Sequence, residues 1–150
     1  MRDKYGVAQD SYCYPKSDVL VNKLNITDAN ELAEAELAFT AFRYSKYSST
    51  IKSLHQFSLN HLRHLHWYLF QDVYDWAGEI RTVDISKGII HPFREGNGRT
   101  QRFFFEELLF FLGFSVNWPD ISKDEWVQAN IDGYYGNLNP LNTILTLATR

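Results

Sequence analysis

The sequence contains one cysteine, Cys13, among its 150 residues, so no disulfide can form within the chain. It has no CxxC pair and no cysteine–histidine cluster, which excludes the usual structural zinc sites. No apolar run approaches the length of a membrane span, and the start of the chain lacks the apolar core of a signal peptide. We therefore expect a cytoplasmic protein without a membrane segment.

Basic residues are too few and too scattered to form a nucleic-acid-binding surface. The formal net charge is -3, and no run of lysine and arginine occurs. The chain is 45% hydrophobic and 16% aromatic, as in a globular protein rather than a disordered one. Its length predicts one domain over residues 1–150, in which residues 1–24 form an N-terminal arm and residues 25–150 form the core.

Hydrophobic spacing and capping residues predict an all-α fold. Helices are expected from Thr27 as N-cap to about Tyr47, from Ser58 as N-cap to a stop at Gly78, from Gly98 or Arg99 to Gly113, after the capping box at Ser122, and from Asn139-Pro140 onward. Residues 79–85 alternate polar and apolar side chains, as in a short strand or an extended connection.

Three histidines, His61, His64 and His66, fall within the second predicted helix. His61 and His64 are three residues apart and could share one face of this helix, but no third metal ligand of a suitable kind lies nearby. Solvated or capped histidines are therefore favoured over a metal site. The chemistry of the chain is instead concentrated in residues 91–102, which read HPFREGNGRTQR and lead into an apolar helix.

The two glycines of this stretch flank Asn97 at the start of the predicted helix. Backbone angles open to glycine can turn successive N–H groups toward one point, and the helix dipole adds positive potential there, so the stretch predicts an anion cradle. No GxxxxGK sequence occurs, which excludes a P-loop protein.

The remaining polar residues fit a bound polyphosphate. Arg99 and Arg102 are three apart and share a helix face, and Glu95 is a suitable magnesium ligand among cationic neighbours. His91 can accept a proton near neutral pH. Together they indicate phosphoryl or nucleotidyl transfer, whereas each residue taken alone would fit a surface ion-pair network.

Residues 91–102 also match the signature of the Fic family, His-x-Phe-x-(Asp/Glu)-Gly-Asn-Gly-(Lys/Arg)-x-x-Arg, at every fixed position. The resemblance extends to residues 72–81 and, more weakly, to residues 12–25 and the two C-terminal helices. It implies a bacterial, all-helical protein adenylyltransferase, whose motif loop lies at the N-terminus of a central buried helix and which transfers AMP from ATP to a Tyr, Ser or Thr hydroxyl of a target protein.

The same resemblance implies roles for individual residues. His91 would be the catalytic base, and Glu95 would bind Mg²⁺ on the phosphates. The expected nucleotide-binding residues are Phe93, Arg94, Glu95, Gly96, Asn97, Gly98, Arg99 and Arg102. The glycine at position 98 separates the chain from the related Doc toxins, which carry lysine there and transfer the γ-phosphate.

Two departures from the family pattern shape the hypotheses. The β-hairpin flap and further core helices that usually precede the motif do not fit between Ile85 and His91, so a catalytically silent domain that binds a nucleotide or a partner is the alternative.

No (Ser/Thr)-x-x-x-Glu-(Gly/Asn) inhibitory motif occurs, and its nearest candidate, residues 27–32, is better explained as a helix cap. A separate antitoxin, in a toxin–antitoxin pair, is therefore expected. A donor other than ATP, such as UTP or CDP-choline, stays open.

Overall fold

The computed structural model describes residues 10–83 and 91–149, and these form an all-helical fold. The helices are α1 (Ala29–Lys46), the 3-10 turn η1 (Leu54–Gln56), α2 (Leu59–Phe70), α3 (Asn97–Phe111), α4 (Lys123–Tyr134) and α5 (Asn139–Ala148). Extended pairing within the described residues is limited to two isolated bridges, Cys13 with Leu20 and Val116 with Thr149. The all-α prediction is confirmed. The predicted strand lies partly outside the described residues, and residues 79–83 are not in a strand.

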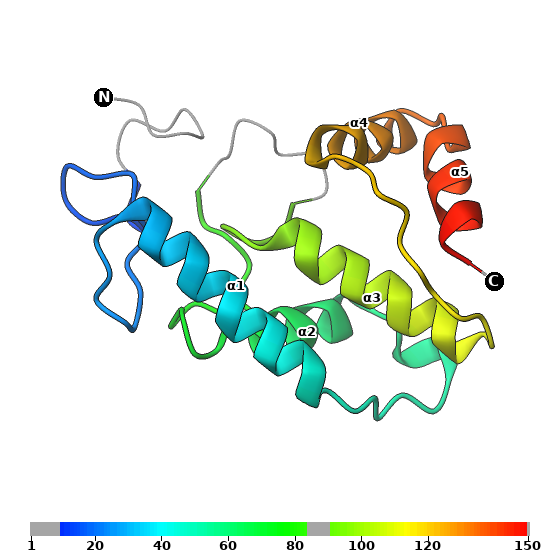
Figure 1. Cartoon of the computed structure of the whole chain (residues 1–150), viewed down its shortest axis with the longest axis horizontal. Coiled ribbons are helices and arrows are strands. Elements are labelled where there is room, and N and C mark those ends of the chain that lie inside the picture. The colour runs from blue at the N-terminus through cyan, green and yellow to red at the C-terminus, as the bar shows by residue number, and fades with distance from the viewer. Residues whose placement is uncertain (1–9, 84–90, 150) are drawn as a thin grey trace.

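Figure 1 shows α3 running between the α1–α2 pair and the α4–α5 pair. The larger core joins α1, α2 and the segment after α2, with Leu65, Phe70 and Val73 fully buried. A smaller cluster joins α4 and α5 around Trp126 and receives Phe105 from α3. The motif helix therefore contributes to both clusters.

Burial along α3 is incomplete. Phe103 is buried, whereas Phe110 is 73% exposed and Leu112 is 49% exposed. The apolar composition of this helix predicted burial nearly all round, but Phe110 in its last turn and the C-cap residue Leu112 are exposed. No helix of the described residues has both the length and the apolar character to cross a bilayer.

Residues 10–24 fold back along the core. The N–H of Val21 donates to the carbonyl of Tyr12 at 2.8 Å, and the N–H of Lys23 donates to the carbonyl of Val73 at 2.8 Å. Tyr12 also packs edge-on against Trp76. This arm therefore holds the segment between α2 and the motif.

Candidate active site

The motif loop enters α3 through a left-handed turn at Gly96. This residue is the N-cap of α3, with φ +76° and ψ 6°, and a Cβ built on it would lie 2.3 Å from Cζ of Phe70. A side chain is therefore excluded here by both conformation and space. Gly96 has no side chain that could cap the helix, so the N–H groups of the first turn after it remain available to an anion.

Asn97 closes the loop on itself. Its Oδ1 accepts from the N–H of Phe93 at 2.9 Å, and its Nδ2 donates to the carbonyl of Phe93 at 2.8 Å. Phe93 is fully buried. The side chain of Asn97 thus fixes the turn from Phe93 to Gly96, which leaves the backbone rather than this amide to face a ligand.

His91 lies at the start of the loop and is held by Arg81. The Nε of Arg81 donates to the carbonyl of His91 at 2.9 Å, and the backbone N–H of Arg81 donates to the carbonyl of Pro92 at 2.8 Å. Burial lowers the pKa of His91 below its ordinary value, and Arg81 and Lys123 act in the same direction against the opposing effect of Glu95. The imidazole is therefore neutral at pH 7, as a proton acceptor must be.

Glu95 carries its carboxylate at the point where the loop meets α3. Its Oε1 accepts from the N–H of Gly96 at 3.1 Å, which orients the group. A single carboxylate beside an uncapped helix end fits a magnesium ion that is shared with substrate phosphates, because Mg²⁺ keeps several waters and takes few protein ligands. Glu95 is the residue that would hold it.

Arg99 and Arg102 leave the same helix toward different neighbours. Nη2 of Arg99 lies 2.5 Å from Oε2 of Glu36, and its guanidinium lies 4.7 Å from the ring centre of Phe70. The guanidinium of Arg102 lies 5.3 Å from the ring of Trp126 on α4. Nε of Arg102 is buried without a hydrogen-bond partner among the described residues. Arg102 therefore retains an N–H donor for an anion, whereas the guanidinium of Arg99 is already paired with Glu36.

Arg94 lies apart from the other motif arginines. Its side chain is 1% exposed, and its Nε donates to Oδ2 of Asp10 at 2.8 Å. Its Nη2 also pairs with the same oxygen. The sequence predicts Arg94 among the nucleotide-binding residues, and in the structure its contact to Asp10 links the loop to the N-terminal arm.

Two residues outside the motif hold it, and the sequence did not single them out for this role. Arg81 binds the carbonyls at the loop start, and His66 lies within 3.0 Å of the carbonyl of Glu95. His66 is fully buried, so the interpretation of a solvated histidine is wrong for this position. His61 pairs instead with Glu107 at 2.5 Å, and no group of three potential metal ligands occurs among the described residues.

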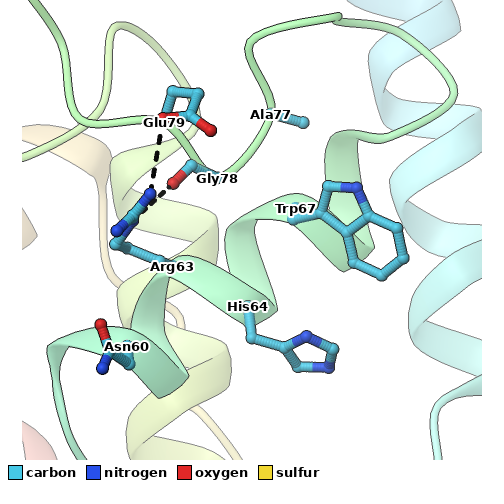
Figure 2. A pocket seen from close by; sticks show the side chains of 7 residues that line it. All are labelled: Asn60, Arg63, His64, Trp67, Ala77, Gly78 and Glu79. Carbon is cyan, nitrogen blue, oxygen red and sulfur yellow. Dashed lines mark hydrogen bonds and ion pairs between the residues drawn. The ribbon is translucent and has the colours of Figure 1, made fainter.

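A surface pocket lies away from the motif. Figure 2 shows its lining, formed by α2 and the turn after it: Asn60, Arg63, His64, Trp67, Ala77, Gly78 and Glu79. Nε of Arg63 donates to the carbonyl of Gly78 at 2.9 Å across this pocket. The pocket thus contains none of the residues from 91 to 102, and its wall supports the turn that contacts His66.

Comparison with known proteins agrees with this architecture. Residues 88–109 match the family model described as Fic/DOC family. The chain is 32% identical to the "Probable protein adenylyltransferase Fic" of Escherichia coli K12, over 97% of this chain and 95% of that protein. It is 30% identical to the protein adenylyltransferase VbhT of Bartonella schoenbuchensis, over 95% of this chain and 39% of that protein.

The alignment with the Escherichia coli protein runs over 195 residues, whereas this chain has 150, so at least 45 residues of that relative have no counterpart here.

Solved structures show the same fold at lower identity. The BepC protein of Bartonella tribocorum, with bound AMPPNP, aligns with a TM-score of 0.77 and 22% identity, over 93% of this chain and 96% of that chain. The N-terminal Fic domain of a Bep effector from Bartonella quintana, with bound ADP, aligns with a TM-score of 0.78 and 22% identity, over 93% of this chain and 94% of that chain.

Proposed function

This chain belongs to the Fic/DOC family, and from that premise we propose that it is a protein adenylyltransferase that transfers AMP from ATP to a hydroxyl of a target protein. The observation that carries the proposal is the complete motif folded as a closed loop on the uncapped N-terminus of α3, with a neutral histidine at its start. The named activity of the aligned relatives supports the same reaction.

The roles follow from the positions of the groups. The oxygen of a target hydroxyl attacks the α-phosphorus of ATP while its proton passes to His91. The bond between the α-phosphorus and the bridging oxygen breaks, and pyrophosphate leaves with the electron pair. N–H groups at the start of α3 and the guanidinium of Arg102 bind the negative charge of the phosphates.

Magnesium is part of the proposal. When bound, it would neutralise charge on the phosphates, and Glu95 would be its protein ligand. Gly96, Asn97 and Gly98 contribute backbone to the phosphate cradle, and Arg99 reaches the outer phosphates once it leaves Glu36. Phe93 anchors the loop in the core, and Arg94 anchors it to the N-terminal arm through Asp10.

The test uses the purified chain, α-labelled ATP, Mg²⁺ and a bacterial lysate. We expect labelled protein with wild type, loss of at least about a hundredfold with His91→Ala, and weakened ATP binding with Arg102→Ala. His55→Ala is the matched control, because this histidine is exposed on η1. A folded wild type that labels no more protein than His91→Ala would refute transfer, and ATP binding without transfer would instead support a silent nucleotide-binding domain.

We further propose that a separate small antitoxin restrains the enzyme. The nearest candidate for an internal inhibitory motif, residues 27–32, acts as a helix start, where Oδ1 of Asp28 accepts from the N–H groups of Asn30 and Glu31 at 2.9 Å. Expression of the wild-type chain alone should arrest bacterial growth, whereas His91→Ala should not. Equal growth with both chains at equal protein levels would contradict a toxin role.

A further inference from the structure

Both ring nitrogens of His66 are engaged by backbone groups from opposite directions. Nδ1 accepts from the N–H of Gly78 at 2.7 Å, so the proton of the neutral ring is on Nε2. Nε2 lies 3.0 Å from the carbonyl oxygen of Glu95 and donates to it. One side chain of α2 thus connects the turn after α2 with the motif loop, 29 residues further along the chain.

Aromatic packing fixes the plane of this imidazole. The ring centre of Phe93 lies 3.9 Å from that of His66 at an interplanar angle of 18°, and the ring of Phe70 lies 4.8 Å away at 26°. His66 has no exposed surface. Because the ring can neither rotate nor exchange its partners with water, it defines where the carbonyl of Glu95 lies.

The carbonyl of Glu95 precedes the left-handed residue Gly96, so its position sets the direction of the first N–H groups of α3. It also sets the origin of the Glu95 carboxylate, since both groups belong to one residue. We propose that His66 is a positioning residue for the transfer reaction: its Nε2–H holds the Glu95 carbonyl, which aims the magnesium-binding carboxylate and the phosphate cradle. This inference rests on the proposed adenylyl transfer.

The alternatives for a buried histidine do not fit these contacts. A metal ligand would need a ring nitrogen with a lone pair to share, but Nδ1 and Nε2 both have partners. If His66 had a purely structural role, loss of its hydrogen bond to Gly78 would affect the protein as much as loss of its hydrogen bond to Glu95. Changing one of these two hydrogen bonds at a time separates a structural role from a positioning role.

Asparagine and glutamine each imitate one nitrogen of histidine. In His66→Gln, the terminal amide nitrogen reaches the place of Nε2 and can donate to the Glu95 carbonyl, while the acceptor for Gly78 is lost. In His66→Asn, Oδ1 takes the place of Nδ1 and can accept from Gly78, while the loop contact is lost. The matched control is Arg63→Ala, which loosens the same turn from the pocket side shown in Figure 2 without a contact to the loop.

The full chain and these three variants are compared by thermal unfolding and by kcat and KM for ATP in the labelling assay. We expect both His66 variants to unfold at lower temperature than wild type. His66→Gln should keep kcat within about threefold, whereas His66→Asn should lower kcat at least about tenfold, because a small displacement of a reacting group has such effects. Arg63→Ala should leave kcat nearly unchanged. Equal kcat for the two His66 variants, or a loss in Arg63→Ala as large as in His66→Asn, would overturn the proposal.

A wild type that transfers no AMP would refute the proposed function, and the positioning of the loop is then read by NMR. The nitrogen shifts of His66 should show a proton on Nε2 and none on Nδ1. The amide of Gly96 should exchange with solvent at least about tenfold faster in His66→Asn than in His66→Gln, because only asparagine releases the loop. The opposite tautomer, or equal exchange in the two variants, would refute the inference independently of activity.

Discussion

Gly96 occupies a position that accepts no side chain, and this gives a prediction at the scale of one residue. Alanine there would require a φ of +76° and would bring its Cβ to 2.3 Å from the ring of Phe70. We expect Gly96→Ala to lower the free energy of unfolding by about 3 kcal/mol, from left-handed strain and overpacking together. Urea unfolding of the purified variant measures this value.

Gly98 is the control for this substitution. A Cβ on Gly98 meets no atom within 4 Å, and the residue lies in the first turn of α3. Gly98→Ala should therefore stabilise the chain by up to about 1 kcal/mol, since alanine has the higher helix propensity. Similar losses in both variants would show that the two glycines are not distinguished by space and conformation.

The pKa of His91 gives a prediction for the pH dependence of transfer. Burial lowers this pKa, so the base is neutral, and able to accept a proton, at a lower pH than an ordinary histidine. We expect the acid limb of the profile of kcat/KM against pH to have its midpoint below 6.5. Rates from pH 5 to 8 with labelled ATP provide the measurement, and a midpoint above 6.5 would contradict it.

At the residue scale, the motif was visible in the sequence because its chemistry is local. His91, Glu95 and Gly96 belong to one short stretch, and their types alone indicate a base, a carboxylate and a left-handed turn. His66 and Arg81 could not be found in this way, because their contacts to the loop are made by folding across 29 and 10 residues. The sequence offered one signal, for Arg81 alone, because this residue ends the stretch 72–81 that resembles the family.

At the scale of elements, capping predicted helix starts better than periodicity predicted helix ends. The side chains of Ser58 and Ser122 cap α2 and α4 as expected. Asp28 rather than Thr27 caps α1, and Asn139 is the first residue of α5 rather than its cap. The cap is decided by which oxygen reaches the free N–H groups, and neighbouring Thr and Asp are equivalent in this respect from sequence.

The end of α2 was predicted at Gly78 but lies at Phe70. Val73 and Trp76 continue the helical spacing because they enter the same core from successive turns, and Val73 is fully buried. The spacing of apolar residues indicates which side chains are buried. It does not distinguish a continuous helix from a helix followed by turns whose side chains enter the same core. The early end places the N–H of Gly78 within reach of His66, so this difference is relevant to the site.

Glu36 joins three elements and provides a prediction at this scale. Its carboxylate accepts from the hydroxyl of Tyr74 and from Nη2 of Arg99, so it connects α1 to α3 and to the turn after α2. In Glu36→Gln, one of these donors would face an amide N–H₂ instead of an oxygen. We expect a loss of about 1–2 kcal/mol of unfolding free energy, since Arg99 is one-third exposed and water replaces part of the contact.

Glu34→Gln on the same helix is the matched control, because Glu34 is exposed. It should change stability by no more than about 0.5 kcal/mol. The two proteins are compared by urea unfolding at pH 7. Equal stabilities would mean that the Glu36 contacts contribute nothing beyond what water supplies.

At the scale of the whole molecule, the sequence predicted the helices but not which sides of them are covered. The apolar run that ends in Phe110, Phe111 and Leu112 predicted a buried helix, yet all three are more than one-third exposed. At least 45 residues of the Escherichia coli relative have no counterpart in this chain, so residues with apolar character need not have a partner within it. Apolar composition predicts a tendency toward burial, whereas burial itself depends on the chain that is present.

The stability of the whole chain should fall as the pH is lowered, because several groups take up protons more readily after unfolding. Burial lowers the pKa of His66 to about 4, so its contribution is complete above the ordinary value near 6.5 and is lost as the pH falls toward 4. The hydrogen bonds from Arg43 lower the pKa of Asp72, and the loss from this carboxyl comes at lower pH, below 3.8.

These two windows can be separated by urea unfolding measured between pH 7 and 3. We expect the free energy of unfolding to decrease by about 1 kcal/mol per pH unit between 6.5 and 4 through His66 alone, since one additional proton binds to the unfolded chain. His66→Gln should reduce this slope, and Asp72→Asn should reduce only the slope at lower pH. An unchanged slope in His66→Gln between pH 6.5 and 4 would show that the buried imidazole is not the group that makes the fold sensitive to acid.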